Sequence, residues 1–206
     1  MSPQELFEAG KYVKVISKLK GTPSQLLAYA YQKNKQWEEA MNVSNSLIVA
    51  QPYNASFYND RGVCKFNLRF KHAIQDFNKA IELEPENAYY YSCRAYIKDK
   101  TGDTEGSIED YQKALDLDPE DAITLNNLGL AEQKLGFTAR ARERFKYSDD
   151  LLGIKTIDSR GDITDKEAGD TVNKLDVSAK SSVWQEFKKM WTKDGFLSFW
   201  KELMKR

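Results

Sequence analysis

Few residues of this sequence belong to the types that carry catalytic or metal chemistry. The chain has one histidine, His72, and two cysteines, Cys64 and Cys93. No second ligand or nucleophile lies near His72, so we expect a surface residue there. Two cysteines make neither a disulfide framework nor a metal set, which fits a reducing compartment. We expect both to be small buried hydrophobic residues.

Motifs for catalysis or phosphate binding are also missing. The sequence contains no glycine-rich phosphate loop, no His/Cys cluster and no Ser/His/Asp arrangement. We therefore expect a protein that is not an enzyme, with no cofactor and no metal. The 31 Lys and Arg balance 31 Asp and Glu. The net charge thus offers no field for nucleic acid, and no nucleic-acid partner is expected.

Length and composition indicate a folded protein outside the membrane. The 206 residues are 41% hydrophobic and 30% charged, which is enough apolar surface for a sizeable core. The longest apolar run, from Leu26 to Tyr31, has six residues, far fewer than the roughly 20 of a membrane span. The first residues lack the basic start and apolar stretch of a secretion signal. We expect a cytoplasmic protein.

An internal repeat organises most of the chain. Pro52, Pro85 and Pro119 are almost evenly spaced along the sequence, and each follows an amphipathic stretch. The small residues Ala40, Ala73, Ser107 and Ala141 recur at the same interval. The segment 73–85 agrees closely with 107–119. Apolar residues at helical spacing, a small residue at each crossing and a closing proline predict two helices per unit.

These features resemble the tetratricopeptide repeat family over roughly residues 21 to 152. Asn126-Asn-Leu-Gly-Leu-Ala and Leu135-Gly136 match the first-helix and turn pattern of the family's repeat unit. The resemblance implies an all-α, right-handed superhelical solenoid whose first helices line a concave groove. One departure is the turn at Leu68-Arg69-Phe70, which lacks the glycine that Gly102 and Gly136 supply in later units.

The expected organisation has four segments. Residues 1–20 are a truncated repeat or cap, and 21–153 hold four repeats at about 21–53, 54–87, 88–121 and 122–153. Residues 154–180 are an acidic flexible linker, and 181–206 an amphipathic tryptophan-rich helix or helix pair. Ser2-Pro3-Gln4-Glu5 and Thr22-Pro23-Ser24-Gln25 each offer an N-cap, a first-turn proline and a capping-box partner.

The resemblance and the helical spacing select the residues that face the groove. Amides, aromatic rings and a few lysines suit an extended or helical peptide segment of another protein. For any single tyrosine, packing between repeats is the favoured alternative. The selected residues are Gln25, Tyr29, Lys33, Asn59, Val63, Phe66, Tyr89, Ser92, Tyr96, Lys100, Asn126, Leu130, Gln133 and Lys134.

Two charged patterns carry further expectations. Co-chaperones of this family hold a C-terminal carboxylate with lysine, asparagine and arginine. The equivalent positions in this sequence supply no cation, whether the family's pattern is placed on the first repeats or shifted by one repeat, so that function is disfavoured. In the first placement the equivalent positions are Gln25, Tyr29, Asp60, Tyr89 and Cys93. Arg61 and Arg94 occur only in the units that also carry an aspartate in the second helix, Asp76 and Asp110. We therefore favour structural ion pairs over ligand contacts for both arginines.

The C-terminal segment 180–206 differs sharply from the repeats. It holds three of the four tryptophans and seven basic against three acidic residues. The residues expected to dock are Trp184, Phe187, Trp191, Phe199, Trp200 and Leu203. This segment could cap the repeats, occupy the groove, or attach to an anionic membrane or a partner. The leading hypothesis is an adaptor that binds a peptide; the alternatives are a peripheral membrane tether and a self-associating scaffold, in which the chain would be a homo-oligomer.

Overall fold

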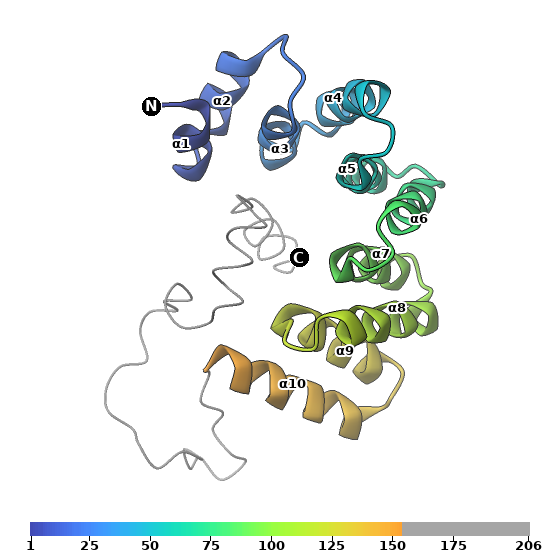
Figure 1. Ribbon diagram of the computed structural model, residues 1–206. Coiled ribbons are helices and arrows are strands. Elements are labelled where there is room, and N and C mark those ends of the chain that lie inside the picture. The colour runs from blue at the N-terminus through green and yellow to red at the C-terminus, as the bar shows by residue number, and fades with distance from the viewer. Residues whose placement is uncertain (154–206) are drawn as a thin grey trace, which may run out of the picture. The chain divides into compact units, whose positions relative to one another are not determined.

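The computed structural model describes residues 1–153, and these are helical throughout, with ten α-helices and no strand in that range (Figure 1). The predicted linker at 154–180 and the tail residues Trp184, Phe187, Trp191, Phe199, Trp200 and Leu203 lie outside the described residues. The described chain divides into two compact parts, which we call unit 1 (residues 1–86) and unit 2 (residues 87–153). No helix in the described range is long and apolar enough to cross a membrane.

Unit 1 contains six helices, each packed on the next in chain order. They are α1 (Pro3–Glu8), α2 (Tyr12–Leu19), α3 (Gln25–Lys33), α4 (Trp37–Ala50), α5 (Ala55–Asn67) and α6 (Ala73–Leu83). Helix α3 also contacts α5, so these two form one layer while α4 and α6 form the other (Figure 1). The outcome is the predicted series of helical hairpins.

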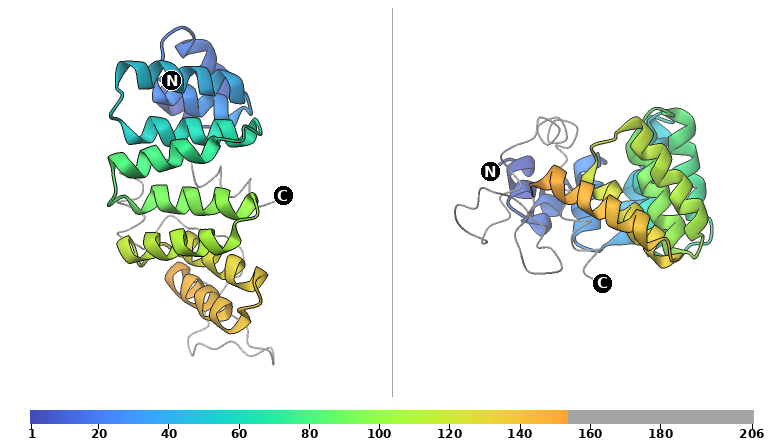
Figure 2. Two further views of the ribbon diagram at one scale, coloured as in Figure 1. Left: turned by 90° about the vertical axis from the view of Figure 1, so that its right-hand side faces the viewer. Right: turned by 90° about the horizontal axis from the view of Figure 1, so that it is seen from below.

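Unit 2 repeats this arrangement with four helices. They are α7 (Ala88–Lys100), α8 (Thr104–Leu117), α9 (Ala122–Lys134) and α10 (Thr138–Leu152). Each packs on the next, and α7 also contacts α9. Figure 2 shows the succession of helices within the unit from two further sides.

Small residues allow the helices of each hairpin to approach closely. Ala40, Ala73, Ser107 and Ala141 are all buried, as the repeat predicts. On the facing helices, a Cβ added to Gly62 would lie 2.9 Å from the Phe77 ring, and one added to Gly129 would lie 2.6 Å from the Phe145 ring. The aromatic side chain of each second helix therefore occupies the space that a larger residue would need.

Side-chain caps start the first helices of the repeats, α3, α5, α7 and α9, which we call the inner helices. Asn54, Asn87 and Asp121 each accept a hydrogen bond from a backbone N–H of the helix that follows. The predicted capping box at Ser2 and Glu5 is present. The cap predicted at Thr22 is wrong: Ser24 has extended backbone angles and caps α3 itself, which leaves Pro23 outside the helix.

The turns inside the hairpins share one backbone shape whatever residue they contain. Lys35, Arg69, Gly102 and Gly136 all adopt a positive φ, of 59°, 63°, 98° and 85°. In each turn the following N–H donates to a carbonyl five residues earlier, as Phe70 does to Lys65 and Phe137 to Glu132. Arg69 thus adopts the left-handed conformation without glycine, at a cost in strain of about 1 kcal/mol.

Candidate functional site

The fourteen residues expected to bind a partner lie on α3 and α5 in unit 1 and on α7 and α9 in unit 2. We call the first set, Gln25, Tyr29, Lys33, Asn59, Val63 and Phe66, the unit 1 face. We call the second set, Tyr89, Ser92, Tyr96, Lys100, Asn126, Leu130, Gln133 and Lys134, the unit 2 face. Five members of the unit 1 face are half-buried, whereas Asn59 is only 1% exposed. Asn59 therefore lies beneath the face and not on it.

A hydrogen-bonded polar cluster forms the centre of the unit 1 face. The Nε2 of Gln25 donates toward three oxygen atoms: the Tyr29 hydroxyl at 2.7 Å, Ser56 Oγ at 3.1 Å and Asp60 Oδ2 at 3.1 Å. The Ser56 hydroxyl donates to Asn54 Oδ1 at 2.7 Å, so its oxygen is left to accept. The cluster joins α3 to α5 through a buried carboxylate, Asp60, which is 6% exposed.

Burial dominates the electrostatics of Asp60. Loss of solvation raises the pKa of its carboxyl from 3.8 to about 7, although hydrogen bonds from Gln25, Tyr29 and Asn59 lower it. One turn along α5, burial and the nearby Asp60 charge raise the pKa of the Cys64 thiol well above its ordinary value. The cluster therefore holds a carboxyl that titrates near neutral pH beside a thiol that does not ionise there.

Two members of the unit 2 face are buried, the aromatic Tyr96 and the polar Ser92. Tyr96 is 6% exposed, and burial raises the pKa of its hydroxyl to about 12. Ser92 is also buried and shares a 2.6 Å hydrogen bond with Thr124 across α7 and α9. Tyr96 is thus buried, as the alternative of packing between repeats predicts, while Tyr89 is half-buried.

Four members of the unit 2 face are exposed: Lys100, Leu130, Gln133 and Lys134. Leu130 is 43% exposed in the middle of α9. The Nζ of Lys134 lies 3.0 Å from Asp99 Oδ1, and the Nζ of Lys100 lies 5.1 Å from the centre of the Tyr96 ring. The unit 2 face therefore offers one exposed apolar side chain, Leu130, and two amines that are already engaged within unit 2.

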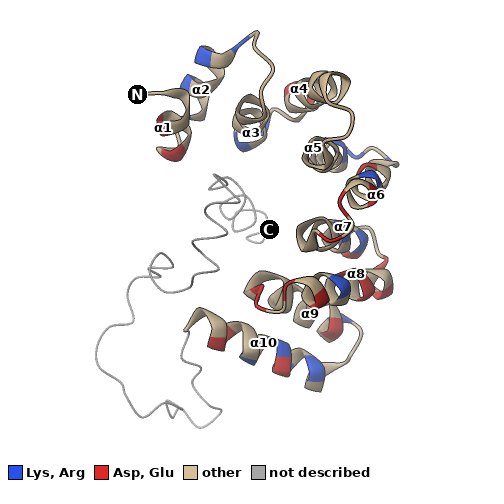
Figure 3. Cartoon of the chain, viewed as in Figure 1, with Lys and Arg blue, Asp and Glu red and all other residues tan. Residues whose placement is uncertain are grey.

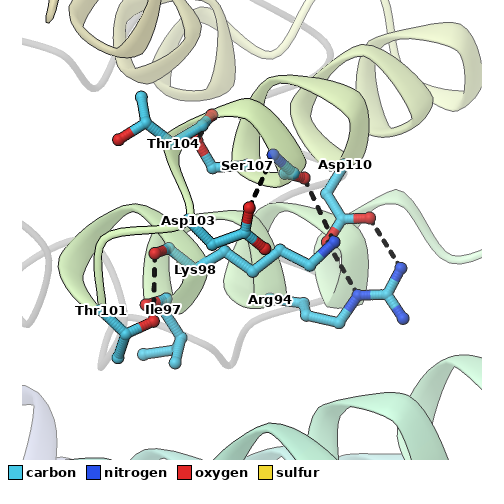
Figure 4. Close-up of polar contacts among 9 residues, drawn as sticks. Arg94, Ile97, Lys98, Thr101, Asp103, Thr104, Ser107 and Asp110 are labelled. Carbon is cyan, nitrogen blue, oxygen red and sulfur yellow. Dashed lines mark hydrogen bonds and ion pairs between the residues drawn. The ribbon is translucent and has the colours of Figure 1, made fainter.

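The predicted structural ion pairs are confirmed in both units. Arg94 donates from Nε and Nη2 to the two oxygens of Asp110 at 2.7 and 2.6 Å, and Lys98 lies 3.0 Å from the same carboxylate (Figure 4). Arg61 donates to both oxygens of Asp76 in the same bidentate way, and the Nζ of Lys65 lies 2.9 Å from Asp76 Oδ2. Both aspartates are buried. The arginines therefore join the two helices of a hairpin and are not free to bind a ligand.

The last hairpin contains a reversed form of this ion pair, which sequence reasoning missed. Glu132 stands where the earlier units have Lys65 and Lys98, and Arg144 stands in place of Asp76 and Asp110. Glu132 is fully buried, and its carboxylate lies 3.7 Å from the Nε of Arg144. Aligning the units at the repeat interval and comparing charge signs would have found this exchange. Sequence reasoning also missed the Asp60 cluster. The spacing of Ser56 and Asp60 places both on one face of α5, but Gln25 reaches them only because α3 packs against α5.

No group of three His, Cys, Asp or Glu residues in 1–153 could hold a metal. His72 is exposed, and Cys64 and Cys93 are buried, as predicted.

Residues 1–86 carry 11 basic and 9 acidic residues, whereas residues 87–153 carry 9 basic and 13 acidic residues. Figure 3 shows these charges on the helices.

Comparison with known proteins identifies the repeat. Residues 99–136 match a family described as TPR repeat, and residues 55–87 match one described as Tetratricopeptide repeat. No curated protein sequence matches the chain.

Several solved structures share the fold. A crystal structure of MamA is 22% identical, with 73% of this chain and 94% of that chain covered and a TM-score of 0.60. MamA 41-end from Desulfovibrio magneticus RS-1 is 21% identical, with 72% and 90% covered and a TM-score of 0.61. The first TPR of Spaghetti (RPAP3) bound to HSP90 peptide SRMEEVD is 26% identical, with 53% and 87% covered and a TM-score of 0.50.

Proposed function

The chain is a tetratricopeptide-repeat protein, and we propose that it is a non-enzymatic adaptor that binds a peptide or helical segment of another protein. Each unit offers such a segment a surface along the first helices of its repeats, the unit 1 face in one unit and the unit 2 face in the other. The hydrogen-bonding side chains of these faces meet the polar backbone of the segment, and the apolar and aromatic side chains cover its apolar residues.

One observation carries this proposal. Leu130, at 43% exposed, lies in the middle of an inner helix, with Gln133 exposed one turn later. An exposed leucine beside an exposed amide is suited to a segment that needs both burial and hydrogen bonding. The similar structure of the first TPR of Spaghetti (RPAP3), bound to an HSP90 peptide, supports the same use of the fold, although this chain lacks the cations of a carboxylate-binding clamp at the equivalent positions.

A peptide selection tests the proposal without knowledge of the natural partner. A random library displayed on phage is selected on the full-length chain, and enriched peptides are measured by fluorescence anisotropy. We expect Leu130→Ser and Gln133→Ala to weaken binding about tenfold, which corresponds to losing one well-buried contact. Val49→Ser is the matched control because Val49 is also an exposed apolar residue in a helix, on α4. Equal binding by the Leu130 and Val49 variants would contradict the proposal.

We also propose that residues 181–206 dock on the chain's own repeats. Charge supports unit 2 as the docking part, because its acidic excess of four matches the basic excess of four in residues 180–206. Co-sedimentation with anionic liposomes, for the full chain and for a chain ending at Leu152, separates self-docking from membrane attachment. Self-docking predicts no lipid-dependent difference; pelleting of the full chain alone would assign the tail to membranes.

A further inference from the structure

Four acidic side chains are at least nine-tenths buried in the described part of the chain: Asp60, Asp76, Asp110 and Glu132. Three of them have a cation within 4 Å. Asp76 pairs with Arg61 and Lys65, Asp110 with Arg94 and Lys98, and Glu132 lies near Arg140 and Arg144. Asp60 takes part in none of the ion pairs formed among residues 1–153. It is the buried carboxylate that lacks a counterion within this range.

The groups that surround Asp60 do not neutralise it. It accepts hydrogen bonds from Gln25, Tyr29 and Asn59, all of which are uncharged donors. The Gln25 amide nitrogen has two hydrogens, yet three oxygens lie within 3.1 Å of it: those of Tyr29, Ser56 and Asp60. Gln25 therefore cannot donate to all three oxygens at once. The cluster has acceptor capacity that Gln25 leaves unused, and an incoming ammonium or guanidinium group would supply further donors.

The position of the cluster suits a side chain arriving from outside. Gln25, which donates to the carboxylate at 3.1 Å, is half-buried, and so are Tyr29, Val63 and Phe66 on the same face. The apolar stem of a lysine or arginine packs well against aromatic rings and a valine, while its charged end reaches a carboxylate. The one nearby thiol, Cys64, stays uncharged at neutral pH and cannot compete for the cation.

We propose that the unit 1 face binds a lysine or arginine side chain of the partner segment, with Asp60 as its counterion. The inference rests on the proposed adaptor function for the identity of the partner as a protein segment. The fold already excludes water from the carboxylate, so a bound cation gains a strong charge-assisted hydrogen bond.

Small probes test this site in the full-length chain. N-acetyl-lysine methylamide, N-acetyl-arginine methylamide and the neutral N-acetyl-norleucine methylamide are titrated while NMR follows the side-chain amide of Gln25. We expect both cationic probes to bind about tenfold tighter than the norleucine probe, and Asp60→Asn to abolish that difference. Glu38→Gln is the matched control, because it removes an acidic side chain of unit 1 on α4 and should leave the difference unchanged.

A second measurement needs no variant. Wild-type affinity for the lysine probe should rise between pH 5.5 and 8.5, as Asp60 loses its proton, while affinity for the norleucine probe stays constant. Equal binding of lysine and norleucine probes at pH 8.5, or a preference that survives Asp60→Asn, overturns the cation site. Because these probes contain no partner, a failed peptide selection would count against the adaptor function alone.

Discussion

Unit 1 and unit 2 use the same device to join their hairpins but present different inner faces. Each contains a bidentate arginine–aspartate pair with a lysine beside it, Arg61–Asp76–Lys65 and Arg94–Asp110–Lys98. At the position of Asp60 in α5, however, unit 2 has Cys93 in α7 and Asn127 in α9. The ion pairs that hold a hairpin together therefore recur in both units, whereas the side chains at the Asp60 position of the inner helices change from repeat to repeat.

The largest effect that we expect is a pH dependence of stability caused by Asp60, the buried carboxylate of unit 1 that has no counterion among residues 1–153. The pKa of Asp60 is raised from 3.8 to about 7 by burial, so folding favours the protonated form. The stability this gives is fully present below pH 3.8 and is lost as pH rises from 3.8 to about 7, by about 4 kcal/mol in all, of which about 3 kcal/mol is lost above pH 5. Asp60→Asn should remove this loss. Urea unfolding of both proteins at pH 5 and pH 8.5 measures it.

In that experiment the variant should gain stability over wild type as the pH increases. A stability difference that is constant between pH 5 and pH 8.5 would show that Asp60 is ionised in the folded chain throughout.

Removing the aspartate of an arginine–aspartate pair should instead lower the stability of the fold. Asp110→Ala leaves Arg94 and Lys98 partly buried without their counterion, so we expect a loss of about 3 kcal/mol. Asp76→Ala should behave alike in unit 1, because its contacts are the same. Thermal and urea unfolding provide the readout. Unchanged melting of Asp110→Ala would refute the structural role of the pair.

A smaller effect compares the closest helix crossings. Gly62 and Gly129 stand at the position that Ala95 occupies in α7. An added methyl group at Gly129 would lie 2.6 Å from the Phe145 ring, which must move, so Gly129→Ala should cost about 2 kcal/mol. Gly62→Ala should cost less because the clash with Phe77 is milder, at 2.9 Å. If both variants are as stable as wild type, the two rings have room for a methyl group that the structure does not show.

The smallest effect comes from the turns. Unit 1 uses Lys35 and Arg69 with positive φ where unit 2 uses Gly102 and Gly136. Arg69→Gly should therefore stabilise unit 1 by about 0.5 to 1 kcal/mol, and Gly102→Ala should destabilise unit 2 by about 1 kcal/mol. Differential scanning calorimetry resolves changes of this size. A destabilised Arg69→Gly protein would mean that the arginine side chain contributes more than its backbone costs.

The repeat architecture was predictable from sequence because its causes recur once in every unit. Small residues such as Ala73 and Ser107, and the arginine–aspartate pairs, are visible as aligned positions. The αL conformation of Arg69 was not predictable from residue type, because the hairpin imposes it on a residue that does not favour it.

The inner faces were predicted only in part. Helical spacing placed Gln25, Leu130 and Gln133 on α3 and α9, but it could not tell that Asn59 and Tyr96 would be buried. Burial depends on how closely α5 and α9 pack beside the preceding inner helix, which is a tertiary property. For the same reason the Asp60 cluster emerges only when α3 lies against α5.

Mapping where a selected peptide binds tests the proposed adaptor function most directly. An enriched peptide from the display library is titrated into the full-length chain, and NMR follows side-chain amides and methyl groups. We expect shifts to change at Leu130 and Gln133 on α9 or at Gln25 on α3, with Val49 on α4 unaffected. Shifts confined to α4, α6 or α8 would contradict peptide binding by the inner helices.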